Sequence, residues 1–223
     1  MGERSVKDLS PTAAKPRLRG WIHAVSAPLS LSAGVVLVVR AASVIAAVTC
    51  SVFTASAVTL FGVSAVYHLG SWSPRVRSVL RRLDHANILL LIAGTYTPIA
   101  VLELRGTSRV VILSVCWGCA ALGFFFQTRF AGLPRWAYVP GYVGLGWIAL
   151  FTLPQLWAAA GLGALVLIVT GGLMYTVGGI IYGLRRPDPW PRWFGFHEIF
   201  HACTVVAFCC QFAAIATVAA RAV

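Results

Sequence analysis

Residues 196–220 read FHEIFHACTVVAFCCQFAAIATVAA, and this stretch decides the class of fold. After His201 it carries no charged side chain, and it exceeds the ~20 apolar residues that a helix needs to cross a bilayer. Backbone N–H and C=O groups find no hydrogen-bond partners in lipid, so a segment that spans a membrane in this way is a helix. The stretch therefore predicts a transmembrane helix whose first turn is polar.

Similar apolar stretches fill most of the remaining chain. The seven stretches cover residues 21–39, 43–68, 86–104, 108–127, 136–154, 160–182 and 196–220. The 223 residues are 59% hydrophobic and 11% charged, which is more apolar surface than a soluble domain of this size can bury. We predict an all-α, polytopic membrane protein, with a seven-transmembrane-helix bundle over residues 21–223 behind a flexible cytoplasmic tail of residues 1–20.

Basic residues are divided unequally between the two ends of this predicted bundle. Fourteen of the 18 lie on the side of the amino-terminal tail, and four lie on the other. Because Lys and Arg concentrate in cytoplasmic loops, we predict a cytoplasmic amino terminus and an external carboxy terminus. The net charge of +12 is explained by contact with anionic lipid headgroups, so membrane lipids are the expected partners and nucleic acid is not.

The polar first turn of the last stretch carries two histidines, His197 and His201, on either side of Glu198. Side chains four residues apart on a helix differ by about 40° in direction and by one turn in height, so both imidazoles can bind one metal ion, most often zinc. In soluble enzymes with this spacing the glutamate is the general base. Glu198 can take that role, hydrogen-bond a metal ligand without touching the metal, or pair with Arg192.

Two other stretches bring polar residues to the same depth. The second predicted span ends at His68, and the third begins just after Asp84, at the same face where His197 and His201 begin the last span. Three imidazoles and one water make a catalytic zinc site with an open position. We predict His68, His197 and His201 as ligands of Zn²⁺, and a zinc-bound water near the cytoplasmic face.

Asp84 and Ser64 are the predicted catalytic partners of that water. Asp84 can orient the water and transfer its proton, and Ser64, four residues before His68 on the same helix face, can hydrogen-bond the water or Asp84. Simpler alternatives exist: His68 can lie at headgroup level, and Asp84 can cap the third helix or pair with the neighbouring arginines at 81 and 82.

Two more histidines are given lesser roles, and no organic cofactor is predicted. His85 points about 100° away from Asp84 on a helix, so we expect it at the interface or behind the metal ligands. His23 starts the first span at the same face and can approach the cluster, but a simple interfacial role is expected. No phosphate-binding loop or dinucleotide fingerprint occurs in the sequence.

Several motifs resemble those of the hemolysin III branch of the progestin and adipoQ receptor family. They are Lys15-Pro-Arg-Leu-Arg-Gly-Trp21, Ser64-Ala-Val-Tyr-His68, Asp84-His85-Ala-Asn-Ile, Ala93-Gly-Thr-Tyr-Thr-Pro98 and His197-Glu-Ile-Phe-His201. The resemblance implies seven helices around a zinc site near the cytoplasmic face, in a bacterial plasma membrane. It also implies ceramide as a model substrate, since the adiponectin receptors of this family are associated with ceramide hydrolysis, and bacterial members are named for cytolysis.

The sequence thus supports one leading hypothesis and two alternatives. The leading hypothesis is a zinc-dependent hydrolase of a lipid amide or ester, similar to a ceramidase. One alternative is an intramembrane metalloprotease that uses Glu198 as its base. The other is a pore-forming, cytolytic or sensory membrane protein in which zinc is structural.

Overall fold

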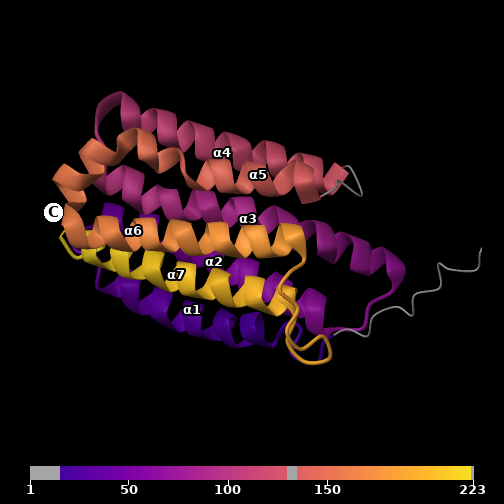
Figure 1. Cartoon of the computed structure of the whole chain (residues 1–223). Helices are drawn as coiled ribbons and strands as arrows, with labels where there is room; N and C mark the ends of the chain where they lie inside the picture. Colours follow the sequence, from indigo (N-terminus) through magenta and orange to yellow (C-terminus); the bar gives the residue numbers. More distant parts are fainter. Residues whose placement is uncertain (1–15, 130–134, 222–223) are drawn as a thin grey trace, which may run out of the picture.

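Helices account for almost all of the chain, as the long apolar stretches predict. The structure is a computed structural model that describes residues 16–129 and 135–221. Within these residues the elements are α1 (Trp21–Val39), α2 (Val44–Leu69), α3 (Pro74–Glu103), α4 (Gly106–Arg129), α5 (Arg135–Gly146), the short 3₁₀ helix η1 (Ile148–Thr152), α6 (Leu153–Leu184) and α7 (Phe196–Ala219). The helices pack into one elongated bundle (Figure 1). The described part contains no strand beyond the isolated bridge Trp190–Phe194, so the all-α prediction is confirmed there.

Six helical segments of the described chain are long and apolar enough to cross a membrane. Large apolar side chains cover the outside of the bundle; on α1, for example, Val25, Leu29 and Val36 are 56%, 63% and 56% exposed. An apolar surface of this extent is stable against lipid and not against water. The bundle is therefore built for a membrane.

One of these six segments, Tyr138–Leu184, contains most of α5 and all of η1 and α6. The helical path is interrupted after α5 and again at Gly161, whose φ of 77° is available mainly to glycine. Figure 1 shows α5 beside the long part of α6, and the Trp147 indole donates to the Thr176 hydroxyl at 2.9 Å. The segment therefore folds back on itself near the boundary that the sequence predicts between residues 154 and 160.

Helix α3 begins much earlier than the predicted third span. It starts at Pro74, where Ser73 is the N-cap and accepts a hydrogen bond from Val76, and it continues to Glu103. A serine cap followed by proline is a strong start signal, whereas hydropathy marks only where the chain enters lipid. The predicted start at residue 86 is wrong for this reason. Asp84 lies well inside the helix, so the alternative that it caps α3 is also wrong.

Close contact between α2 and α3 depends on a glycine, which gives a first testable prediction. A Cβ at Gly94 would overlap the Ser56 hydroxyl, which is buried and donates to Phe53 O at 2.7 Å. We expect Gly94→Ala to lower the free energy of unfolding by about 1–3 kcal/mol, as overpacking does elsewhere. Denaturant unfolding in detergent measures it.

The matched control is Gly118→Ala in α4, where a Cβ would meet no atom within 4 Å. We expect that variant to be as stable as the wild type or more stable, because alanine is the better helix former. Equal losses in both variants would contradict the packing explanation.

Candidate metal centre

Three histidines from opposite parts of the sequence meet at one end of the bundle. His68 lies in the last turn of α2, and His197 and His201 lie in the first turns of α7; all three are buried. The Nε2 atoms of His68 and His197 are 3.1 Å apart, and the candidate ligand atoms of all three histidines lie within 4.8 Å of one another. Zinc–nitrogen bonds of about 2.0–2.1 Å in a tetrahedron place the nitrogens roughly 3.3 Å apart. The cluster can therefore hold one metal ion.

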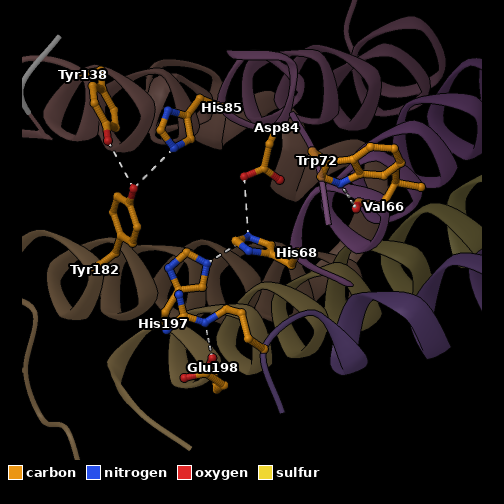
Figure 2. Close-up of polar contacts among 10 residues, drawn as sticks. Val66, His68, Trp72, Asp84, His85, Tyr138, Tyr182, His197 and Glu198 are labelled. Atoms are coloured by element: carbon orange, nitrogen blue, oxygen red, sulfur yellow. Dashed lines mark hydrogen bonds and ion pairs between the residues drawn. The ribbon is translucent and has the colours of Figure 1, made fainter. Parts of the chain in front are cut away.

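Asp84 and Ser64 lie beside these histidines. The Asp84 Oδ2 atom is 3.8 Å from His68 Nε2, and Figure 2 shows the carboxylate of α3 facing the His68 ring. Ser64 on α2 is next to Asp84 and is only 1% exposed. Its hydroxyl interacts with the Asp84 carboxyl and has no closer partner among the described residues. A hydroxyl buried in this way fits a site that also holds a polar ligand such as water.

The arginines expected as alternative partners of Asp84 have other contacts or positions. Arg82 donates to the Thr128 carbonyl at 2.8 Å, which joins α3 to α4. Arg81 is exposed. Asp84 faces His68 instead, with 3.8 Å between its Oδ2 and His68 Nε2, so the carboxyl group belongs to the histidine cluster.

Glu198 has a structural environment that the sequence did not reveal. Its side chain is 1% exposed and forms an ion pair with Arg19, in the turn before α1. Its second carboxylate oxygen accepts from the Gly195 N–H at 2.8 Å and so caps α7. In Figure 2 the carboxylate lies apart from His68 and Asp84. The alternative that Glu198 pairs with Arg192 is wrong, because its carboxylate pairs with Arg19.

Arg19 belongs to the predicted tail of residues 1–20, most of which lies outside the described residues. The described end of that segment packs on the loop between α6 and α7: Arg17 N–H donates to the Arg192 carbonyl at 3.0 Å, and Leu18 N–H to the Trp193 carbonyl at 3.2 Å. These contacts bring Arg19 to the start of α7.

The Arg19–Glu198 pair gives a second prediction. Arg19→Leu leaves a buried carboxylate without its cation, and we expect the free energy of unfolding to fall by about 3 kcal/mol. Arg17→Leu is the control, because the Arg17 guanidinium lies on the exposed Trp193 ring, 4.5 Å from its centroid, where a loss of about 1 kcal/mol or less is expected. Thermal unfolding of both variants in detergent tests this; an Arg19 variant as stable as the Arg17 variant would contradict it.

His23 is more deeply placed than predicted. Its ring stacks on the His201 ring, with centroids 3.8 Å apart and planes 7° from parallel, and only 3% of the residue is exposed. The prediction of an interfacial residue is therefore wrong. Neither ring nitrogen has a hydrogen-bond partner in the described chain. The alternative that His23 approaches the cluster from the start of the first span is confirmed by this stacking contact.

His85 lies beside the cluster and faces another way, as its position on the helix predicts. Its Nε2 atom is 3.4 Å from the Tyr182 hydroxyl, which is 3.2 Å from the Tyr138 hydroxyl. Figure 2 shows this second polar group across from Asp84. It connects α3, α5 and α6 near the histidines, and His85 is outside the group that can hold the metal.

A cavity of about 140 Å³ opens from the histidine cluster into the bundle. His197, Ser64 and Asp84 line one end of it, and Leu153 and Leu156 line the other. Most of the side chains between these ends come from α3, α5, α6 and α7 and are apolar. The arrangement joins a polar, metal-capable end to a long apolar interior.

Comparison with known proteins shows the family of this chain. The family described as "Haemolysin-III related" matches residues 12–212. "Hemolysin-3" of Bacillus cereus is 31% identical over 163 residues, which are 72% of this chain and 74% of that protein. "Hemolysin-3 homolog" of Bacillus subtilis (strain 168) is 30% identical over 187 residues, 81% of this chain and 83% of that protein. The chain is thus a multi-pass integral membrane protein that belongs to the haemolysin-III-related family.

Proposed function

We propose that this protein is a membrane-embedded, zinc-dependent hydrolase of a lipid amide or ester, similar in reaction to a ceramidase. One observation carries the proposal: three buried histidines and Asp84 meet at the polar end of an apolar cavity inside a membrane bundle. Polar side chains are expensive at membrane depth and are seldom kept there without a function.

The residues present suit zinc as the metal. His68, His197 and His201 would hold it, since three imidazole nitrogens are a common catalytic donor set for this ion. The Ser64 hydroxyl and the Asp84 carboxyl lie together beside the histidines, which suits an open position occupied by water or substrate. When bound, zinc lowers the pKa of a coordinated water to about 7 and polarises a carbonyl group.

The side chains around this centre transfer the proton, orient the water and bind the acyl chain. Asp84 accepts the proton of the attacking water and returns it to the leaving amine or alcohol. Ser64 donates a hydrogen bond to Asp84 or to the water and so fixes the direction of attack. The apolar cavity receives the acyl chain and excludes bulk water, which strengthens each polar contact at its mouth.

Activity against defined lipids tests the proposal. Purified protein in nanodiscs is incubated with ceramide and with an ester of the same acyl chain, and released fatty acid is measured by mass spectrometry. Hydrolysis that follows the zinc content after chelation and readdition is expected. Stoichiometric zinc without hydrolysis of any acyl amide or ester would reject the proposal.

A metalloprotease is the weaker enzyme hypothesis. It needs Glu198 as base, and that carboxylate is engaged by Arg19 and by the Gly195 N–H. Asp84, in contrast, is the acidic residue whose carboxyl group faces the ring of a candidate ligand, His68. The positions of the two carboxylates therefore favour a lipid hydrolase.

Cytolysis is a second candidate because two relatives carry the name hemolysin. In that case the metal clamps α2 to α7, and leakage of liposomes does not depend on hydrolysis. Leakage by wild type and by Asp84→Asn at equal protein density separates the candidates: equal leakage favours lysis, and leakage lost with hydrolysis favours the enzyme.

We also propose seven membrane crossings, with the histidine end of the bundle in the cytoplasm. Gln155, at the start of α6, donates to Ser108 at the start of α4 at 2.9 Å, which supports a return of the chain to the opposite end between α5 and α6. Single cysteines in a cysteine-free chain test this with an impermeant maleimide on spheroplasts. Ala41→Cys and Gln155→Cys are expected to react and Ser71→Cys is not; protection of position 155 together with 71 would overturn the seven crossings.

A further inference from the structure

Gln211 is an unusual residue for its position deep in the bundle. It lies on α7 in the mainly apolar part of the cavity, and only 6% of it is exposed. Its Nε2 donates to the Ile168 carbonyl at 3.1 Å. Its Oε1 has no hydrogen-bond partner in the described chain. Leaving such an atom buried and unpaired costs about 1–3 kcal/mol, so a ligand that pairs with it gains affinity.

The free atom is an acceptor. The Ile168 carbonyl can only accept, so the amide group that faces it must be the NH₂, and the oxygen is left toward the cavity. The amide is also confined, because a Cβ at Gly171 of α6 would lie 2.7 Å from Nε2. The partner of Gln211 must therefore be a donor, such as a hydroxyl group.

Tyr175 adds a second polar group to the same cavity. It lies one helical turn along α6 from Gly171, and its ring lines the cavity. Its hydroxyl is buried and has no hydrogen-bond partner in the described residues. A phenol both donates and accepts, so it can pair with the oxygen of a ligand hydroxyl whose hydrogen is given to Gln211.

The distance of Gln211 from the metal centre determines how many carbons separate the bound carbonyl from a hydroxyl group at Gln211. His197, Thr204 and Gln211 follow one another at intervals of seven residues and all line the cavity. On a helix this spacing keeps Gln211 within about 40° of the direction of His197 and roughly 21 Å from it along the axis, or roughly 15 Å from His201. Carbon–carbon bonds of about 1.5 Å give an extended chain roughly 1.25 Å per carbon, so these distances correspond to about 12–16 carbons.

We propose that Gln211 and Tyr175 bind a hydroxyl group carried on the substrate's acyl chain, about 12–16 carbons from the scissile carbonyl. The inference rests on the proposed function for the placement of the carbonyl at the metal. It deepens that function by naming the substrate class: amides or esters of long-chain acids hydroxylated near the far end. Selectivity follows because a site built around buried polar groups rejects a chain that leaves them unpaired.

Binding tests the inference without relying on hydrolysis. Octadecanoic acid, 2-hydroxyoctadecanoic acid and 15-hydroxyoctadecanoic acid, whose hydroxyl lies within the proposed range, are titrated by calorimetry into the zinc-loaded protein in nanodiscs. We expect the 15-hydroxy acid to bind about tenfold more tightly than the other two, the gain from one well-made hydrogen bond to a buried group. The variant Gln211→Met, which keeps side-chain length and removes the acceptor, is expected to lose this preference.

Two further variants test whether the preference depends on the polar groups of the cavity and not on the substitution itself. Gln155→Met makes the same substitution at an exposed position outside the cavity lining, and the preference is expected to remain. Tyr175→Phe is expected to reduce the preference several-fold. Equal binding of all three acids by wild type overturns the inference and indicates that Gln211 pairs with buried water only. A preference for the 15-hydroxy acid in protein that hydrolyses no lipid supports the binding site and rejects the proposed hydrolase.

Discussion

Replacing His201 with alanine is expected to remove the bound zinc, about one ion per chain in the wild type, and to lower lipid hydrolysis at least about 10³-fold. His201 is buried between the His23 ring and the two other histidines of the cluster. Two imidazoles leave a zinc ion with too few protein ligands for tight binding. Elemental analysis of purified protein and the release of fatty acid measure the two effects.

Two further variants make this result specific. His201→Cys offers a thiolate at the same position, and partial recovery of zinc is expected if the alanine variant fails for lack of a ligand and not for lack of fold. His85→Ala removes a neighbouring histidine outside the candidate metal group, and it is expected to keep its zinc. An alanine variant at position 201 that retains one zinc per chain and full activity would refute the site.

Sequence alone predicts the helices well because a chain that crosses lipid can adopt few backbone conformations. Lipid requires internally satisfied backbone groups, so each long apolar stretch becomes a helix, and α1 runs over the residues expected, Trp21–Val39. The start of α3 escapes this reasoning, since Ser73 and Pro74 begin the helix well before the lipid-facing residues. Local capping sets a helix end, and hydropathy does not report it.

The histidine cluster is predictable for a related reason. Span order alone carries His68 and Asp84 to the end of the bundle where α7 begins, and the structure brings them together with His197 and His201 there. Contacts that depend on side-chain packing are not predictable in this way. Span order brings His23 to the same end of the bundle but does not predict that its ring stacks on His201, and no neighbouring residue indicates that Arg19 pairs with Glu198.

Exchanging each carboxylate for its amide should separate the two acidic residues near the metal centre. Asp84→Asn is expected to lower the rate of lipid hydrolysis by about 10²–10⁴-fold, the usual contribution of a general base, with zinc content unchanged. Asparagine keeps the shape of the side chain but cannot accept the proton. Glu198→Gln is expected to lower the rate less than about tenfold, since its carboxylate serves the α7 cap and Arg19 and does not contact the reaction.

Thermal unfolding is expected to rank the losses of stability of the two variants in the opposite order to their losses of hydrolysis rate. Glu198→Gln leaves Arg19 without its buried anion, and we expect a loss of about 3 kcal/mol. Asp84→Asn removes the charge of a partly buried carboxyl group and is expected to unfold at the wild-type temperature or above. The lipid hydrolase therefore requires a slow, stable variant at position 84 and an active, unstable one at position 198. The metalloprotease requires the reverse order of rates, and that result would transfer the role of base to Glu198.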